Sequence, residues 1–268
     1  MVSNGMKKLL FVLGILFLLA ALVFGGLKFY DVFFTEEPED MSAANQNAKE
    51  KQEEQQPVQE NQPVFGKSKH SLDDPASIWV VVNKTRPLNP KNYVPADRVF
   101  PSVTLRVPGN ESMQIRADIS HAVKALFDGA KAAGHSLKFS SGYRSYSYQV
   151  NLYSGYVKSI GQAEADKQSA RPGHSEHQTG LSLDVCDNAG CDLVQSFGQT
   201  AMGQWVAAHA HEYGFIIRYP EGKTAITGYE YEPWHLRYVG TELAGEMRGA
   251  NIQTLEEFFG LPAAPDYL

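Results

Sequence analysis

The chain has 268 residues, of which 43% are hydrophobic and 20% are charged, and its formal net charge is −6. This balance is typical of a globular protein and excludes a fully disordered, collagen-like or polytopic membrane chain. Two cysteines are too few for a disulfide scaffold or for a four-cysteine zinc site. The acidic net charge argues against nucleic acid as the main partner.

An uncharged and mostly apolar run at residues 9–27 lies between Lys8 and Lys28. As a helix it would span roughly 28 Å, close to the hydrocarbon thickness of a bilayer. Lysines precede the run and an acidic stretch follows it, so the positive-inside rule places the N-terminus in the cytoplasm. We therefore expect residues 1–34 to be a single-pass membrane anchor with the rest of the chain outside. A cleaved signal peptide, followed by secretion, is the alternative.

An acidic, polar segment follows the apolar run. Residues 35–66 contain eight acidic side chains against two lysines, together with three prolines. Such a segment buries too little apolar surface to offset the entropy lost on ordering. We expect residues 35–70 to form a disordered acidic linker and residues 71–268 to form one folded domain.

The folded domain shows both helical and strand-like periodicity. Apolar residues between 115 and 130 recur at helical spacing, which predicts an amphipathic helix that ends before Gly134. Further helices are expected at 202–213, which Gly214 would end, at 241–249 and at 254–259. Short strands are expected at 137–140, 181–185, 215–219 and 234–238. This mixture predicts a single α+β domain that is large enough for a substantial core.

Two segments, residues 172–185 and 229–235, concentrate side chains that can bind a metal. A catalytic zinc needs three protein ligands and leaves a fourth position for water. His177 and Asp184 lie seven residues apart, with Gly180 between them to allow a turn. Alternation along a strand at 181–185 would direct Asp184 into a cleft. His235 can supply the third ligand from a neighbouring strand.

A possible base accompanies these ligands. Glu232 precedes His235 by three residues, and a carboxylate there can take a proton from water without binding the metal itself. On spacing alone two alternatives stay open: His174 as the ligand in place of His177, and Glu230 in the role of Glu232.

Cys186 and Cys191 enclose a turn-prone loop, and outside the membrane we expect a disulfide between them. Cys186 lies two residues after Asp184, so a thiolate ligand is a further alternative. Three better ligands are already placed, which argues against it.

Residues 175–235 carry a pattern that resembles the zinc signature of the LAS metallopeptidases: Ser175-x-His177-x-x-Gly180-x-x-x-Asp184, then Glu232-x-x-His235. The match is closest to the VanY-type D-alanyl-D-alanine carboxypeptidases. Similar blocks at 140–145, 213–220 and 226–229 extend it over most of residues 115–240. L,D-carboxypeptidases and Hedgehog signalling domains share this fold. The resemblance implies a compact α+β domain with a small central antiparallel sheet flanked by helices.

The resemblance also assigns roles to single residues. It implies that His177, Asp184 and His235 bind one Zn²⁺ and that Glu232 is the catalytic base. Arg144 matches the family arginine that stabilises the oxyanion, and a planar, permanently charged guanidinium suits that role.

Three further residues are candidates for substrate binding. Gln149 lies about one helical turn beyond Arg144 and can reach the same cleft. Ser175 can donate a hydrogen bond to the terminal carboxylate of the substrate, and Tyr219 can line the pocket. Ser182 stands where the family usually has a small apolar alanine, and nothing in the sequence explains its hydroxyl group.

The resemblance implies a zinc-dependent D,D-carboxypeptidase that removes the C-terminal D-alanine from peptidoglycan stem peptides. The expected location is the outer face of a bacterial membrane, with a monomeric catalytic domain. One alternative keeps the zinc and the fold but changes the cut, as an L,D-carboxypeptidase on tetrapeptide stems or as an endopeptidase. The other alternative is a zinc-containing wall-binding module without catalysis.

Overall fold

A computed structural model of the protein describes residues 65–188 and 190–268. The predicted membrane span at residues 9–27 lies outside these ranges, so it stays a prediction. Within the described ranges, no helix combines the length and the apolar character that crossing a bilayer requires.

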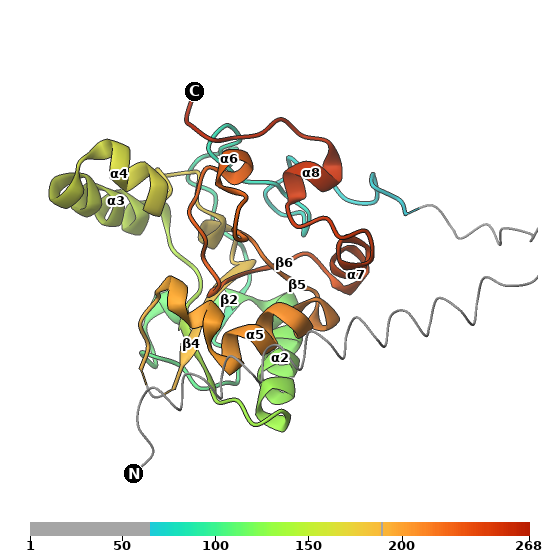
Figure 1. The fold of residues 1–268 in the computed structure, drawn as a ribbon. Helices are drawn as coiled ribbons and strands as arrows, with labels where there is room; N and C mark the ends of the chain where they lie inside the picture. The colour runs from blue at the N-terminus through green and yellow to red at the C-terminus, as the bar shows by residue number, and fades with distance from the viewer. Residues whose placement is uncertain (1–64, 189) are drawn as a thin grey trace, which may run out of the picture. The chain divides into compact units, whose positions relative to one another are not determined.

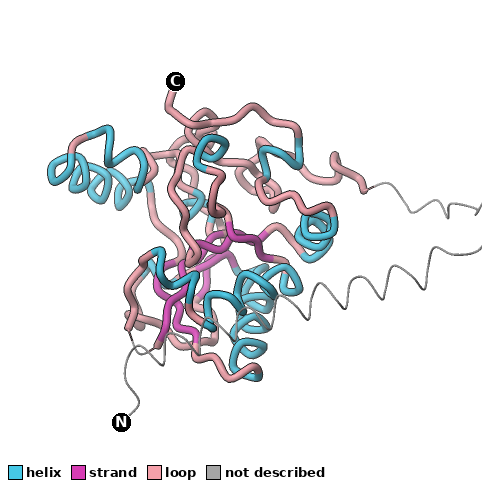
Figure 2. Tube along the Cα trace, in the orientation of Figure 1, coloured by secondary structure: helices cyan, strands magenta, loops and turns pink. Residues whose placement is uncertain are grey.

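The centre of the domain is a four-stranded antiparallel sheet with the strand order β3-β4-β6-β5 (Figure 1). Its strands are β3 (Leu137–Ser141), β4 (Ser182–Asp187), β5 (Phe215–Ile217) and β6 (His235–Tyr238). Two shorter strands, β1 (Arg98–Val99) and β2 (Ile115–Arg116), form a separate antiparallel pair. Figure 2 shows the strands in the middle of the domain with helices around them. The expected α+β fold with a small antiparallel sheet is confirmed.

The helices flank this sheet. The α-helices are α2 (Ser120–Ala132), α3 (Tyr146–Ile160), α4 (Gln162–Gln168), α5 (Ala201–His209), α6 (Thr224–Thr227), α7 (Thr241–Gly249) and α8 (Leu255–Phe259). The 3₁₀ helices are η1 (Glu111–Met113), η2 (Ala117–Ile119), η3 (Glu176–Thr179), η4 (Gln195–Gln199) and η5 (Ala210–Tyr213). In Figure 1, α2 and α5 lie together beside the sheet, whereas α3 and α4 form a pair set off to one side.

The first predicted helix begins later than expected. It starts at Ser120 rather than at residue 115, because Ile115 pairs with Val99 in the small sheet and residues 117–119 form a 3₁₀ helix. Ile115, Ile119 and Leu126 are nevertheless fully buried. The apolar spacing therefore identified the buried positions correctly but not the conformation of the first of them.

The remaining predicted elements lie close to their expected positions. Helix α5 and η5 together cover residues 201–213 and end at Gly214, which has the left-handed φ of 83°. The strands expected at 215–219 and 234–238 are shorter, at 215–217 and 235–238. Helices α3 and α4 occupy residues 146–168, for which the apolar pattern predicted no bounds.

Two apolar clusters form the core, and one extended segment contributes to both. Trp79 and Val81 pack into the cluster beneath α7 and α8, whereas Val80 and Val82 belong to the larger cluster around α2 and the sheet. The indole Nε1 of Trp79 donates a hydrogen bond of 2.9 Å to the carbonyl of Val239. Alternation along residues 79–82 thus joins the two clusters into one domain.

Residues 65–70, which composition places in the linker, pack against the domain. The ring of Phe65 lies 5.5 Å from the ring of Trp79 and 5.5 Å from that of Phe258. The ammonium group of Lys67 donates a hydrogen bond to the carbonyl of Phe258. Aromatic packing at a single apolar residue therefore extends the folded part to Phe65.

Candidate active site

Strands β4 and β6 bring two of the predicted ligands together. Asp184 pairs with His235 across the antiparallel ladder, and directly opposite residues project from the same face of a sheet. The adjacent pair, Leu183 and Leu236, is buried in the apolar core. The strand alternation therefore presents one carboxylate and one imidazole on the same face.

Helix η3 supplies the third side chain. The ring Nδ1–H of His177 donates a hydrogen bond of 2.6 Å to the carbonyl of Gly142, which leaves its Nε2 to face Asp184 Oδ1 at 3.3 Å. Gly180 ends η3 with a φ of 70°, and a Cβ atom there would lie 3.1 Å from the amide nitrogen of Arg116. A glycine therefore suits the turn that leads from His177 into β4.

These three side chains form a group that can hold a metal ion. The ligand atoms of His177, Asp184 and His235 lie within 4.8 Å of one another, and all three residues are buried. Asp184 Oδ1 faces both rings but has no hydrogen-bond partner, and burial of an unpaired carboxylate oxygen is costly. Two imidazoles and one carboxylate are a typical donor set for catalytic zinc. The three residues therefore fit one Zn²⁺.

The protonation of the group follows from burial and close charges. Burial lowers the pKa of His177 to about 4, so its ring is neutral, as a metal ligand requires. Burial alone would raise the pKa of Asp184, but the neighbouring His177 holds it well below its usual range. Burial also acts to lower the pKa of His235, yet the nearby carboxylates of Glu176 and Glu232 raise it to about 9. A metal ion bound here would compete with that proton.

Glu232 adjoins the group through His235. Its Oε2 lies 3.5 Å from His235 Nδ1, and its carbonyl accepts a hydrogen bond from the amide of His235. Burial raises the pKa of the Glu232 carboxyl, which suits a group that accepts a proton and returns it. Glu230 is exposed, and the structure records no contact between its side chain and the three ligand residues. The carboxylate beside the metal group is therefore that of Glu232.

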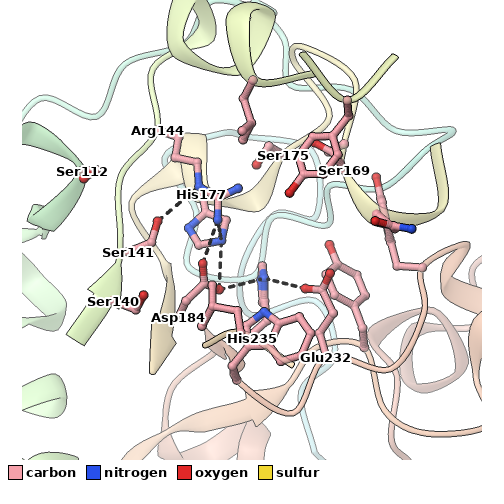
Figure 3. A pocket seen from close by; sticks show the side chains of 18 of the residues that line it. Ser112, Ser140, Ser141, Arg144, Ser169, Ser175, His177, Asp184, Glu232 and His235 are labelled. Atoms are coloured by element: carbon pink, nitrogen blue, oxygen red, sulfur yellow. Dashed lines mark hydrogen bonds and ion pairs between the residues drawn. The ribbon is translucent and has the colours of Figure 1, made fainter. Parts of the chain in front are cut away.

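A permanent positive charge lies on the other side of the ligands. Arg144 Nη2 donates a hydrogen bond of 2.7 Å to Asp184 Oδ2 and lies 2.9 Å from His177 Nε2 (Figure 3). Its Nε donates to Ser141 Oγ at 3.2 Å, and its backbone amide donates to the carbonyl of His177. Arg144 lies in the short connection between β3 and α3, and Ser145 caps α3 by accepting a hydrogen bond from the amide of Tyr148.

A cavity of about 890 Å³ opens over this group, and Ser175 and Tyr219 are among the residues that line it. Gln149 is not among them. It is fully buried, and its amide group donates hydrogen bonds to Ser169 Oγ and to the carbonyl of Ala170. Gln149 therefore anchors α3 to the chain that follows α4, and its role in substrate binding stays a prediction.

His174 lies away from the ligand group. Its Nδ1–H donates a hydrogen bond of 2.9 Å to the carbonyl of Asn83, and its ring packs edge-on against Tyr267. His177, three residues later, is the histidine that adjoins Asp184. This placement resolves the alternative that spacing alone left open.

The predicted disulfide between Cys186 and Cys191 is present. Cys186 is therefore not a thiolate ligand, although it follows Asp184 by two residues. The bridged loop leads to Leu193 and Val194, which line the cavity.

The structure shows two features that the motifs did not reveal. The first is a face of α3: Tyr148, Leu152 and Tyr156 recur at intervals of four residues and line the outer cavity. The spacing is visible in the sequence, but it also fits a helix packed in a core. The second is the role of Ser182, whose hydroxyl donates a hydrogen bond of 3.2 Å to the buried Glu176.

A His–Asp–His group with a buried carboxylate and an arginine beside it, all in one open cavity, defines the site of a metal-dependent hydrolase. A family model described as VanY, D-alanyl-D-alanine carboxypeptidase, matches residues 112–241. The YodJ protein of Bacillus subtilis (strain 168) is 44% identical over 191 residues, which make up 70% of this chain and 69% of that protein.

Two solved structures extend the comparison. The LdcB LD-carboxypeptidase is 45% identical, with a TM-score of 0.66, and the match covers 69% of this chain and 87% of that one. A mutant of the vancomycin resistance D,D-pentapeptidase VanY in complex with Zn(II) is 31% identical, with a TM-score of 0.54, and the match covers 67% of this chain and 97% of that one. The chain belongs to the VanY-type family of LAS metallopeptidases, and it is a carboxypeptidase of that family.

The Asp184→Asn substitution tests the metal site. It keeps the size of the side chain but removes the negative charge that draws a cation between the two imidazoles. We expect the affinity for zinc to fall by more than about tenfold, measured by competition with a chromogenic chelator. The control is Asp192→Asn, because Asp192 is exposed and stands eight residues further along. Equal zinc affinity in the two variants would show that Asp184 is not a ligand.

Proposed function

We propose that the protein is a zinc carboxypeptidase that releases the C-terminal D-alanine from peptidoglycan stem peptides. The observation that carries the proposal is the position of Glu232 and Arg144 on either side of the His177–Asp184–His235 group, in one open cavity. Hydrolysis of a peptide bond needs a proton acceptor and a partner for the oxyanion in addition to a metal. A wall-binding module with a structural zinc site would need neither.

The mechanism follows from these positions. Zinc held by the three ligands would supply a Lewis acid that acidifies water and polarises the scissile carbonyl. Glu232 takes a proton from the attacking water and passes it to the leaving amine, a role for which its buried carboxyl with a raised pKa is suited. The guanidinium of Arg144 offsets the negative charge that develops on the carbonyl oxygen.

The rest of the cavity suits a peptide in an extended conformation. Ser175 is buried at the cavity wall, where its hydroxyl can donate a hydrogen bond to the terminal carboxylate. Tyr148, Leu152 and Tyr156 on α3 offer an apolar wall to the residues on the N-terminal side of the scissile bond. One chain supplies all of these residues, which supports a monomeric catalytic domain.

Two forms of the reaction fit this site. The resemblance to the VanY-type D-alanyl-D-alanine carboxypeptidases favours the D,D form, in which the enzyme trims a pentapeptide stem. The L,D form, in which it trims a tetrapeptide stem, is a second candidate. The greater identity to the LdcB LD-carboxypeptidase, 45% against 31% for the VanY D,D-pentapeptidase, favours this second form.

Product analysis separates the two forms. The zinc-loaded fragment from Phe65 onward is incubated with pentapeptide and, separately, with tetrapeptide stems, and the products are identified by mass. Loss of D-alanine from the pentapeptide alone would establish the D,D form, and loss from the tetrapeptide would establish the L,D form. If zinc is bound and neither peptide is shortened, the proposed reaction is wrong.

The Glu232→Gln substitution tests the base. The amide cannot accept the proton from water, but the fold and the three ligands remain. We expect kcat to fall by about 10²- to 10⁴-fold while zinc stays bound. Glu230→Gln, on the exposed side of the same segment, should keep kcat within a few-fold. The reverse result, with Glu230→Gln inactive and Glu232→Gln active, would assign the base to Glu230.

We further propose that residues 9–27 anchor the enzyme in the bacterial membrane, with the catalytic domain outside. The support is the uncharged run itself, the lysines before it and a substrate that lies outside the membrane. The full chain should remain in the membrane fraction after a carbonate wash, whereas a chain that starts at residue 35 should be soluble. Release of an N-terminally shortened protein into the medium would instead indicate a cleaved signal.

A further inference from the structure

A cluster of buried charges lies beside the metal group and contacts it at His235. Glu176, Arg218, Arg237 and Glu256 are each at most 1% exposed. Glu176 Oε1 accepts hydrogen bonds of 2.8 Å from Arg218 Nε and of 2.8 Å from Arg237 Nη1. The two carboxylates balance the two guanidinium groups. Burial of such a network removes four charges from water, and apolar residues of similar volume would often be no less stable.

The arginines of this network are themselves held in place. Arg218 forms a two-pronged ion pair with Glu256, at 3.0 Å and 2.7 Å. Arg237 donates hydrogen bonds to the backbone carbonyls of Ile78 and Val80. Because both guanidinium groups have fixed partners, Glu176 Oε1 has one fixed position. The other oxygen, Oε2, accepts a hydrogen bond from Ser182.

The imidazole of His235 lies between this network and the ligand group. Its Nδ1 faces Asp184 Oδ1 and Glu232 Oε2, each at 3.5 Å. Its Nε2, on the opposite side of the ring, is buried without a hydrogen-bond partner, and the nearest carboxylate oxygen recorded for it is Glu176 Oε2 at 3.6 Å. A half-turn of the ring would place carbon atoms where both nitrogens now lie.

We propose that Glu176 is a positioning residue for the metal site: its Oε2 receives the Nε2–H of His235 and thereby turns Nδ1 of His235 toward Asp184. Arg218 and Arg237 fix the carboxylate, and Ser182 fixes the oxygen that faces the ring. A carboxylate behind a ligating histidine sets both the tautomer and the orientation of the ring. With the proton on Nε2, the lone pair of Nδ1 is available to a metal.

The same contacts explain the hydroxyl group of Ser182. Its hydroxyl lies 3.2 Å from Oε2, the oxygen that faces His235, and not from Oε1, which the arginines occupy. Ser182 and His235 therefore both face the same oxygen of Glu176.

Glu256 provides a matched control for Glu176. Both carboxylates are fully buried and both pair with Arg218, but Glu256 contacts Asn83 and not His235. We would compare Glu176→Gln with Glu256→Gln by thermal unfolding and by chelator competition for zinc. A purely structural network predicts a similar loss of thermal stability in both variants and the same zinc affinity. The positioning role predicts a loss of zinc affinity of about 10- to 100-fold in Glu176→Gln alone.

A second measurement on the unaltered protein covers the case in which Glu176→Gln does not fold. Nitrogen-15 NMR of the zinc-loaded protein reports which ring nitrogen of His235 carries the proton. We expect a proton on Nε2 that exchanges slowly with water, and no proton on Nδ1. A proton on Nδ1, or rapid exchange at Nε2, would overturn the proposal.

The positioning role of Glu176 rests on the proposed zinc site but not on the choice of peptide. The experiments can therefore contradict the positioning role and the proposed function separately. If the unaltered protein binds no zinc, the proposed function itself is wrong. If it binds zinc and the two glutamine variants bind it equally, the function stands and Glu176 has no positioning role. The zinc affinity is measured without any peptide substrate.

Discussion

The site depends on the antiparallel register between β4 and β6. Asp184 and His235 come from segments about fifty residues apart, and they meet because they are opposite each other in the ladder. The leucine pair beside them is buried in the core, so apolar packing sets the same register that aligns the ligands. A slip of one residue would exchange the two faces and bury the ligands among apolar side chains. The apolar core therefore stabilises the register that aligns the two ligands.

The second constraint is the disposition of charge. Asp184 and His235 share one face of β4 and β6 with the next pair, Ser182 and Arg237, which belongs to the buried network of Glu176. Buried charges of this kind are costly unless each has partners. Here both guanidinium groups of the buried network have fixed acceptors, so the network forms a rigid polar support beside His235. A rigid support suits ligands whose geometry must be set before the metal arrives.

The sequence was informative where short-range spacing decides the structure. The ligands at 177 and 184 are seven residues apart with the glycine between them, and the base lies three residues before His235. The fold class followed from the apolar periodicity together with the family resemblance. The start of α2 was not predictable, because the pairing of Ile115 with Val99 overrides a helical pattern. The partners of Glu176 were equally hidden, since they lie 42 and 61 residues further along the chain.

The floor and the walls of the cavity come from different parts of the fold. The floor consists of strand residues that belong to the zinc motifs and are buried with the sheet. The walls come from α3, which is set off from the rest of the domain, and from the chain after the disulfide loop at Leu193 and Val194. The floor sets the chemistry of the site. We infer that the choice between D,D and L,D bonds depends on the shape of α3 and of this loop, because these parts of the wall lie outside the zinc motif.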